Sequence, residues 1–295
     1  MKVLSFGEVL WDIIEGKNYL GGAPFNFAAH IAQCGAKAYI ISRLGKDELG
    51  RKAAAMAASY EVNTSLIQWD EKYPTGTVEV VLQEGQPDYT IHTSVAYDFI
   101  DYADVNSKLE EQEFDVFYFG SLAQRSPTTK QTIKNLLAKH NFDYVFYDVN
   151  LRKDSYNKDI IDDSLKLCNI LKLNHSEVPV VSQLLYKTEL SLEAFCKKMY
   201  NDYELELIII TAAEKGCYIF EADKLQLISG RAVEVADAVG AGDSFSAAFM
   251  YIYFHKGDAI AAAKVANQVG GFVASHHGAI PTYSEEIRGD RKSVV

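Results

Sequence analysis

The sequence predicts an α/β protein with a mainly parallel central sheet flanked by helices, and a small second β-sheet beside it. Short, nearly all-apolar runs recur along the 295 residues, and helical patterns separate them. Strands that are apolar throughout are typical of parallel sheets covered on both faces by helices. The stretch 75–93 interrupts this alternation with the pattern of a hairpin.

The elements of the body follow in chain order. Residues 3–6 predict the first strand, and residues 23–34 predict a helix that Gly35 ends. A second strand is expected at 38–41, followed by a helix through 49–59. The later strands are expected at 116–119, 144–147, 170–173 and 207–210. This order predicts one domain over residues 1–295.

Two segments outside this alternation look extended. Residues 77–82 and 89–93 predict strands joined by a turn through 85–87, and residues 12–20 lack helix signals. We expect the segments at about 12–20 and 75–96 to pair into a lid over a ligand site. Because an exposed sheet edge invites pairing, the same sheet could join two copies in a homodimer.

Composition excludes several classes of partner. The formal net charge of -11 disfavours nucleic acid, which needs a basic surface. No apolar run approaches the roughly 18 residues of a membrane span. No targeting signal is recognised, because Glu8 and Asp12 interrupt the apolar start. The four cysteines lie far apart, which indicates buried, reduced thiols in a cytoplasmic protein.

A glycine-rich turn near the C-terminus is the strongest chemical feature. Gly240-Ala241-Gly242-Asp243 runs directly into an apolar helical pattern. The backbone N–H groups of such a turn, with the positive end of the helix dipole, form an anion hole. Asp243 could accept a proton from an attacking hydroxyl beside it, as phosphoryl transfer to an alcohol requires. The alternative is that Asp243 only caps the helix.

Polar residues near the N-terminus suit a hydroxyl-rich ligand. Gly21 and Gly22 would let a ligand approach the backbone, and Asn26 projects from the helical turn that Pro24 begins. Asp12 is expected just past the first strand, at the edge where α/β sheets bind ligands. The alternatives are a plain strand-to-helix turn and a solvent-exposed acid. No G-x-G-x-x-G follows the first strand, which disfavours a dinucleotide-binding oxidoreductase.

These motifs, in this order, resemble the ribokinase-like sugar kinases, or PfkB family, over essentially the whole chain. The match lies in Gly21-Gly22-Ala23-Pro24-Phe25-Asn26 and in Asp237-x-x-Gly240-Ala241-Gly242-Asp243. The resemblance implies a ribokinase-like three-layer sandwich and an ATP-dependent kinase. It places Asp243 at the catalytic base. It implies an anion hole at Gly240, Ala241 and Gly242. It implies sugar-binding positions at Asp12, Gly22 and Asn26.

The resemblance also implies a nucleotide and metal site. Asn174-His175-Ser176-Glu177 looks like the family's N-x-x-E motif, whose acid organises the water shell of Mg²⁺. The segment from Thr211 to Gly216 resembles T-x-G-x-x-G but has Ala213 where glycine is usual, so its path is expected to differ. Asn267 matches a position lining the adenine pocket. Asp237, with the loop 275–279, sits where many members bind a monovalent cation such as K⁺.

The substrate is predicted from weaker features. Phe6-Gly7-Glu8 and Ala96-Tyr97-Asp98 look most like fructokinases, which often have Trp in place of Tyr97. Asp148-Val149-Asn150-Leu151-Arg152 resembles D-x-N-x-R, shared with 2-keto-3-deoxygluconate kinases, where the arginine would meet a carboxylate. Arg152 could instead form an internal salt bridge. We expect D-fructose to be phosphorylated at a primary hydroxyl. The alternatives are another PfkB sugar or nucleoside kinase and a catalytically idle sensor.

Overall fold

The computed structural model describes residues 1–83, 86–109, 112–285 and 287. Its larger sheet has nine strands in the order β13-β12-β11-β10-β9-β8-β1-β4-β5. The strands from β11 to β5 are parallel, and β12 and β13 add an antiparallel edge. The bounds are β1 (Lys2–Phe6), β4 (Lys37–Gly45), β5 (Ile67–Asp70), β8 (Val116–Gly120), β9 (Tyr144–Asp148), β10 (Ile170–Asn174), β11 (Leu207–Thr211), β12 (Gly216–Glu221) and β13 (Lys224–Ser229).

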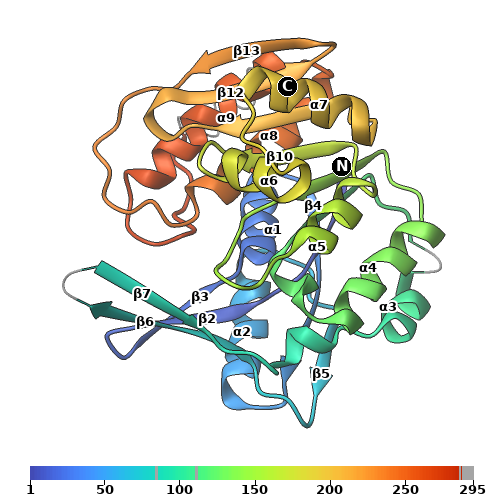
Figure 1. Ribbon diagram of the computed structural model, residues 1–295. Helices are drawn as coiled ribbons and strands as arrows, with labels where there is room; N and C mark the ends of the chain where they lie inside the picture. Colours follow the sequence, from blue (N-terminus) through green and yellow to red (C-terminus); the bar gives the residue numbers. More distant parts are fainter. Residues whose placement is uncertain (84–85, 110–111, 286, 288–295) are drawn as a thin grey trace.

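Helices cover both faces of this sheet, which gives the three expected layers (Figure 1). One core joins the sheet to α1 (Ala23–Gln33), α2 (Glu48–Ser59), α8 (Ala241–Lys256) and α9 (Ala259–Ala274). The other joins it to α3 (Tyr102–Leu109), α4 (Pro127–Lys139), α5 (Lys158–Leu165), α6 (Glu177–Tyr186) and α7 (Leu192–Tyr203). Alternate residues of each strand serve the two cores, so Val3 faces the first and Leu4 the second.

The four-stranded sheet, ordered β3-β2-β6-β7, projects below the end of the body that carries α8 and α9 (Figure 1). Its strands are β2 (Leu10–Ile14), β3 (Lys17–Gly21), β6 (Gly76–Gln83) and β7 (Gln86–Ile91). The two extended segments therefore pair, through parallel contacts of β2 with β6. The first segment is itself a hairpin, because Glu15 and Gly16 both take positive φ, at 49° and 75°.

The second hairpin differs from its predicted form. Gly85, predicted to begin the turn, lies outside the described residues. Pro87 lies within β7 and not in the turn. A strand can accept proline there because β7 is at the edge of its sheet, where a missing N–H breaks no ladder.

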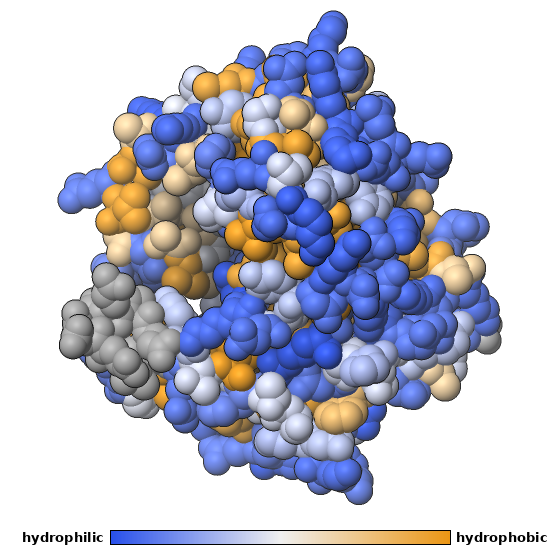
Figure 2. Space-filling model, viewed as in Figure 1, coloured by the Kyte–Doolittle hydropathy of each residue, from blue (hydrophilic) through white to orange (hydrophobic). Residues whose placement is uncertain are grey.

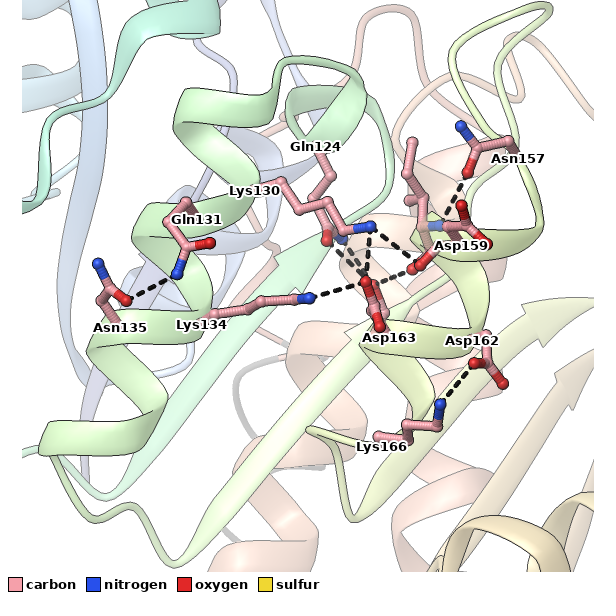
Figure 3. A network of polar contacts seen from close by, with 12 residues as sticks. Gln124, Lys130, Gln131, Lys134, Asn135, Asn157, Asp159, Asp162, Asp163 and Lys166 are labelled. Carbon is pink, nitrogen blue, oxygen red and sulfur yellow. Dashed lines mark hydrogen bonds and ion pairs between the residues drawn. The ribbon is translucent and has the colours of Figure 1, made fainter.

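The helices α4 and α5 are joined by a surface network of charges (Figure 3). Lys130 and Lys134 of α4 both pair with Asp163 of α5, at 2.7 and 2.8 Å. Exposed pairs of this kind contribute little to stability, about 0–1 kcal/mol each. The four cysteines are buried and form no disulfide, as predicted. In the part of the chain that the structure describes, no helix is long and apolar enough to cross a membrane.

Candidate active site

The two glycine-rich motifs meet, although more than 200 residues separate them. Asn26 lies in the first turns of α1 and Asp243 in the first turn of α8, and these helices pack against each other. The Asn26 amide donates a 2.8 Å hydrogen bond from Nδ2 to Oδ2 of Asp243, and both side chains are buried. The structure therefore brings together the residues predicted to serve the sugar and the proton transfer.

The turn before α8 depends on a glycine. Gly240 takes φ 78° as the residue that precedes the helix. A Cβ there would lie 2.2 Å from the carbonyl oxygen of Ala279. Helix α8 begins at Ala241, so Asp243 lies inside its first turn, and no side chain caps the helix. The alternative of Asp243 as a capping residue is therefore wrong.

Asp243 is a more basic carboxylate than usual. Burial raises its pKa to about 6, and the charge of Asp148 acts in the same direction. The hydrogen bond from Asn26 and the charges of Lys172 and Arg152 oppose this shift. At neutral pH the carboxylate is thus mostly ionised, with a proton affinity closer to that of a working general base.

Asp12 lies in the segment predicted to form the lid, and not directly after the first strand, where it was also expected. It is within β2, on the small sheet, and not at the carboxyl end of β1, which ends at Phe6. The reason is that the chain turns at Gly7 and enters the hairpin before Asp12. Its carboxylate lies against Gly21, because a Cβ on Gly21 would lie 2.5 Å from Oδ2 of Asp12. Burial raises the pKa of Asp12 to about 6, against the nearby charge of Arg152.

Gly22 and Arg152 lie around the same space. Gly22 takes φ 109°, and a Cβ on it would lie 2.4 Å from the carbonyl oxygen of Glu8. Arg152 is exposed in the loop after β9. Its charge acts on Asp12, Glu8 and Asp243, which places it near all three carboxylates. This proximity supports its position at the ligand site.

Glu8 was not predicted as a site residue. It is 4 % exposed, and burial raises its pKa to about 7. The charge of Arg152 opposes that shift and the charge of Asp243 adds to it. A carboxylate inside an apolar N-terminal segment was a signal for this position, since buried acids are rare unless paired.

The predicted nucleotide residues share one edge of the sheet. Asn174 ends β10 and Thr211 ends β11, and the two are direct register partners. Ala213 takes φ 48°, in the region glycine favours, so the loop keeps such a conformation without glycine. Gly216 begins β12, and a Cβ on it would lie 2.2 Å from the carbonyl oxygen of Ile228.

Asn267 lies on α9, away from these strand ends in the sequence. Its Nδ2 donates to the carbonyl oxygens of Ile228 and Ser229, at 3.0 and 3.4 Å. The amide nitrogen thus ties α9 to the end of β13. Any contact with a nucleotide would come from the remaining atoms of this side chain.

Glu177 is held as an N-x-x-E acid would need to be. Its two carboxylate oxygens accept the backbone N–H of Leu151, at 2.7 Å, and of Asn174, at 2.8 Å. Burial is the main cause that raises its pKa. A carboxylate fixed in this way suits Mg²⁺, which keeps several waters and binds substrate phosphates. The residues present therefore fit a metal held through water.

Asp237 contacts the loop with which it was predicted to act. Its carboxylate accepts the N–H of Val239, at 3.0 Å, and of Gly278, at 3.2 Å. Its own N–H donates to the carbonyl oxygen of Ala274. These contacts order the loop that also carries Ala279, beneath Gly240.

A buried ion pair was also missed by the sequence reasoning. Lys172 of β10 pairs with Asp148 of β9 at 2.9 Å, on the sheet face beneath α8. Asp148 is the first residue of the D-x-N-x-R segment, but no role was predicted for it. Lys172 was a lone charge in an apolar strand, which is the signal that could have found it.

The surface is hollowed beside the small sheet. Figure 2 shows this recess between the small sheet and the part of the body that carries α8 and α9. Asp12 comes from the sheet side, and Asp243 comes from the body side. A ligand in this recess would be bound between two separately positioned parts of the chain.

Comparisons with known proteins show which proteins the chain resembles. The chain is 29% identical over 300 residues to a protein named as a sugar kinase from Pyrococcus horikoshii, covering 95% of this chain and 92% of that one. It is 25% identical over 313 residues to fructokinase-1 of Oryza sativa subsp. japonica, covering 97% and 95%.

Solved structures share the fold. The structure of that sugar kinase from Pyrococcus horikoshii in complex with ATP has a TM-score of 0.85 and 25% identity, covering 99% of this chain and all of that one. A Vibrio cholerae fructokinase in a fructose-, ADP- and potassium-bound form has a TM-score of 0.83 at 22% identity, covering 95% and 94%. The latter likeness concerns the fold alone.

A family model identifies the family of this chain. The model of the pfkB family carbohydrate kinases matches residues 2–286, which is nearly the whole sequence. The protein therefore belongs to the pfkB family of carbohydrate kinases, phosphotransferases that act on sugars.

Proposed function

We propose that this protein transfers the γ-phosphoryl group of ATP to a primary hydroxyl of a sugar, most specifically D-fructose, giving fructose 6-phosphate. The observation that carries the proposal is the 2.8 Å contact between Asn26 and Asp243. It joins a group suited to sugar hydroxyls to a buried carboxylate at a helix N-terminus. Neither group alone implies a sugar and a phosphate together.

Asp243 would act as the general base of the reaction. Its ionised carboxylate would accept the proton of the attacking hydroxyl, while Asn26 fixes the carboxylate in place. The N–H groups of the turn would stabilise the charge on the phosphoryl oxygens. Among the predicted donors at Gly240, Ala241 and Gly242, the N–H of Ala241 also contacts the carbonyl of Ala238, at 3.3 Å. Gly240 and Gly242 are therefore the stronger candidates of the three.

Asp12, Gly22 and Asn26 would hold the sugar. Asp12 could accept hydrogen bonds from two neighbouring hydroxyls, and the small sheet that carries it would serve as a lid. Ile14 and Tyr19, which are 39% and 48% exposed, lie on the same face of this sheet as Asp12. Closing the lid over a sugar would bury this apolar surface and exclude water, which otherwise competes as the phosphoryl acceptor.

The nucleotide would lie over the ends of β10 and β11. Asn174, Thr211 and Gly216 border that edge of the sheet, and Asn267 would form the wall behind it. Glu177 would hold waters of Mg²⁺, which supplies positive charge to the phosphates when bound. Asp237, with the loop 275–279, is proposed to hold a monovalent cation such as K⁺.

Assembly and location form part of the same proposal. The outer strands of the lid, β3 and β7, leave sheet edges that favour a homodimer. A monomer in light scattering at assay concentration would contradict the dimer. A cytoplasmic location suits four buried cysteines that form no disulfide.

The second candidate is a kinase for 2-keto-3-deoxygluconate, and Arg152 is the residue that favours it. An exposed guanidinium near the site could pair with a sugar carboxylate. The variant Arg152→Gln separates the two. With fructose as substrate, we expect its KM to change less than threefold. With the acidic sugar, loss of a charged hydrogen bond of about 1.5–3 kcal/mol should raise KM at least tenfold.

The decisive experiment is an ADP-release assay over a panel of sugars. Fructose, 2-keto-3-deoxygluconate, ribose and nucleosides are each offered with ATP, Mg²⁺ and K⁺. The proposal predicts the highest kcat/KM with fructose. Turnover of the keto-acid sugar without turnover of fructose would replace fructose with the second candidate. Sugar binding by calorimetry with no ADP release across the panel would indicate an idle sensor instead.

A further inference from the structure

A buried ion pair lies directly beneath the proposed catalytic turn. Lys172 and Asp148 are register partners on β10 and β9, and are 6% and 1% exposed. Nζ of Lys172 lies 2.9 Å from Oδ2 and 3.1 Å from Oδ1 of Asp148. The cost of removing two charges from water usually cancels their attraction, so such a pair is poor at stabilising a fold. Its presence calls for another explanation.

The pair contacts the N-terminal part of α8 at two points. The Ser246 hydroxyl lies 3.3 Å from Oδ2 of Asp148 and donates to the carbonyl oxygen of Gly242, at 3.0 Å. A Cβ built on Gly242 would lie 3.3 Å from Nζ of Lys172. Glycine at this position thus lets the ammonium group approach the backbone of the turn, immediately before Asp243.

A second set of contacts links the pair to Asn26. The Tyr118 hydroxyl donates to Oδ2 of Asp148 at 3.0 Å. The Tyr118 ring stacks on Phe27, with centroids 3.7 Å apart and planes 6° from parallel. Phe27 follows Asn26, whose amide binds Asp243. The ion pair therefore supports both the turn that carries the carboxylate and the side chain that orients it.

We propose that Lys172 and Asp148 are positioning residues for phosphoryl transfer: together they hold the turn of Gly242 and Asp243 in place and balance the charge around the Asp243 carboxylate. This inference rests on the proposed function, because it assumes that Asp243 accepts the proton. It gives a reason for keeping two opposite charges buried at this point of the sheet.

The two charges of the ion pair affect the pKa of Asp243 in opposite directions, which can be measured. The charge of Asp148 raises the pKa of Asp243, and the charge of Lys172 lowers it. Other groups whose charge couples to Asp243 are Arg152, which lowers its pKa, Glu8 and Tyr118. Because the two members of the pair act in opposite directions, removing one or the other should move the ionisation of Asp243 in opposite directions. A purely structural role would give no such reversal.

The test measures kcat/KM against pH, with the sugar that the panel identifies. Lys172→Met should move the acid limb of the profile to higher pH by about one pH unit, and Asp148→Asn should move it to lower pH by a similar amount. The double variant loses both charges and should return the limb close to its original position. Lys134→Met and Asp163→Asn remove the same charges from the surface network of Figure 3 and serve as matched controls, with no displacement expected.

The outcomes are distinct. Opposite displacements that cancel in the double variant would support the inference. Equal loss of kcat/KM at every pH, or displacement in one direction by both single variants, would overturn it. If Lys172→Met does not fold, Asp148→Asn and the double variant, which leaves no buried charge unpaired, decide the matter. Normal turnover in Asp243→Asn would instead refute the proposed base, whatever the pair variants do.

Discussion

Two glycines at the ends of α8 provide a matched test of the turn that carries Asp243. Gly240 precedes the helix at φ 78°, and Gly257 follows it at φ 64°. Alanine in either left-handed position costs about 1–2 kcal/mol. The surroundings differ, because a Cβ on Gly240 would lie 2.2 Å from the Ala279 carbonyl oxygen, whereas nothing lies within 4 Å of one on Gly257. The two substitutions therefore share the backbone strain and differ in the steric clash.

The size of the clash sets the expected loss. A carbon–oxygen contact normally needs about 3.3 Å, so the turn and Ala279 must separate by about 1 Å. The Ala279 oxygen cannot move freely, because Nε2 of His30 contacts it at 2.9 Å. Burial lowers the pKa of His30 to about 4, so its neutral ring donates to Ala279 and accepts from the Tyr283 hydroxyl. Losing this bond adds about 0.5–1.5 kcal/mol to the strain in Gly240→Ala.

The assay combines thermal denaturation with ADP release. Gly257→Ala should lose about 1–2 kcal/mol, or roughly 2–6 °C in Tm, and keep its kcat. Gly240→Ala should lose about 1.5–3.5 kcal/mol. Because a 1 Å misplacement of catalytic groups can cost about 100-fold, its kcat should fall by a similar factor. If the kcat of Gly240→Ala were within threefold of the parent, the position of this turn would not be critical for catalysis, and the reasoning would be refuted.

Three further predictions concern buried polar groups. Asp243→Asn should raise stability at pH 8 by about 3 kcal/mol, because the raised pKa of the carboxyl penalises its ionised form above pH 6; the gain should vanish below about pH 4 in thermal melts. Tyr97→Phe should keep or raise Tm, since the buried hydroxyl has no hydrogen-bond partner among the described residues, and a loss above 1 kcal/mol would contradict this. Glu177→Gln should lose about 1–3 kcal/mol, because one of the N–H groups of Leu151 and Asn174 would face an amide donor, and should need more Mg²⁺ for half-maximal activity. Unchanged melting and metal dependence would contradict the last prediction.

The fold was predictable where periodicity reports burial directly. The apolar runs at 116–119, 144–147 and 207–210 each became a central strand, because parallel strands covered on both faces need apolar side chains throughout. Glycine and proline at 21–24 marked the start of α1 for local reasons. The edge strands β5 and β13 were missed for different reasons. In β5 the polar residues Gln68 and Asp70 occupy buried positions, and in β13 most positions are exposed or half-buried, so neither strand has a clear apolar pattern.

The motif residues of the candidate site were predictable from the sequence, but the buried residues that surround them were not. Asn26 and Asp243 stood out because each follows glycines at a helix start, and the structure brings them into contact. Asp12 was predicted in the lid segment, but its expected position at the end of the first strand was wrong, because the course of the chain after Gly7 depends on pairing of β2 with the distant β6. Lys172 was not predicted as a site residue, because its role depends on pairing with Asp148 on the neighbouring strand, which the sequence alone does not show.

The central claim is that Asp243 takes the proton from a sugar hydroxyl, and one comparison tests it most directly. The turnover of Asp243→Asn is measured at pH 8 with saturating sugar and ATP, beside Asp163→Asn as the same change on the surface. Asparagine keeps an oxygen to accept from Asn26, so sugar affinity by calorimetry should stay within threefold of the parent. Loss of a general base predicts a kcat lower by about 10²–10⁴-fold, with Asp163→Asn unchanged. A kcat for Asp243→Asn within tenfold of the parent would contradict the claim.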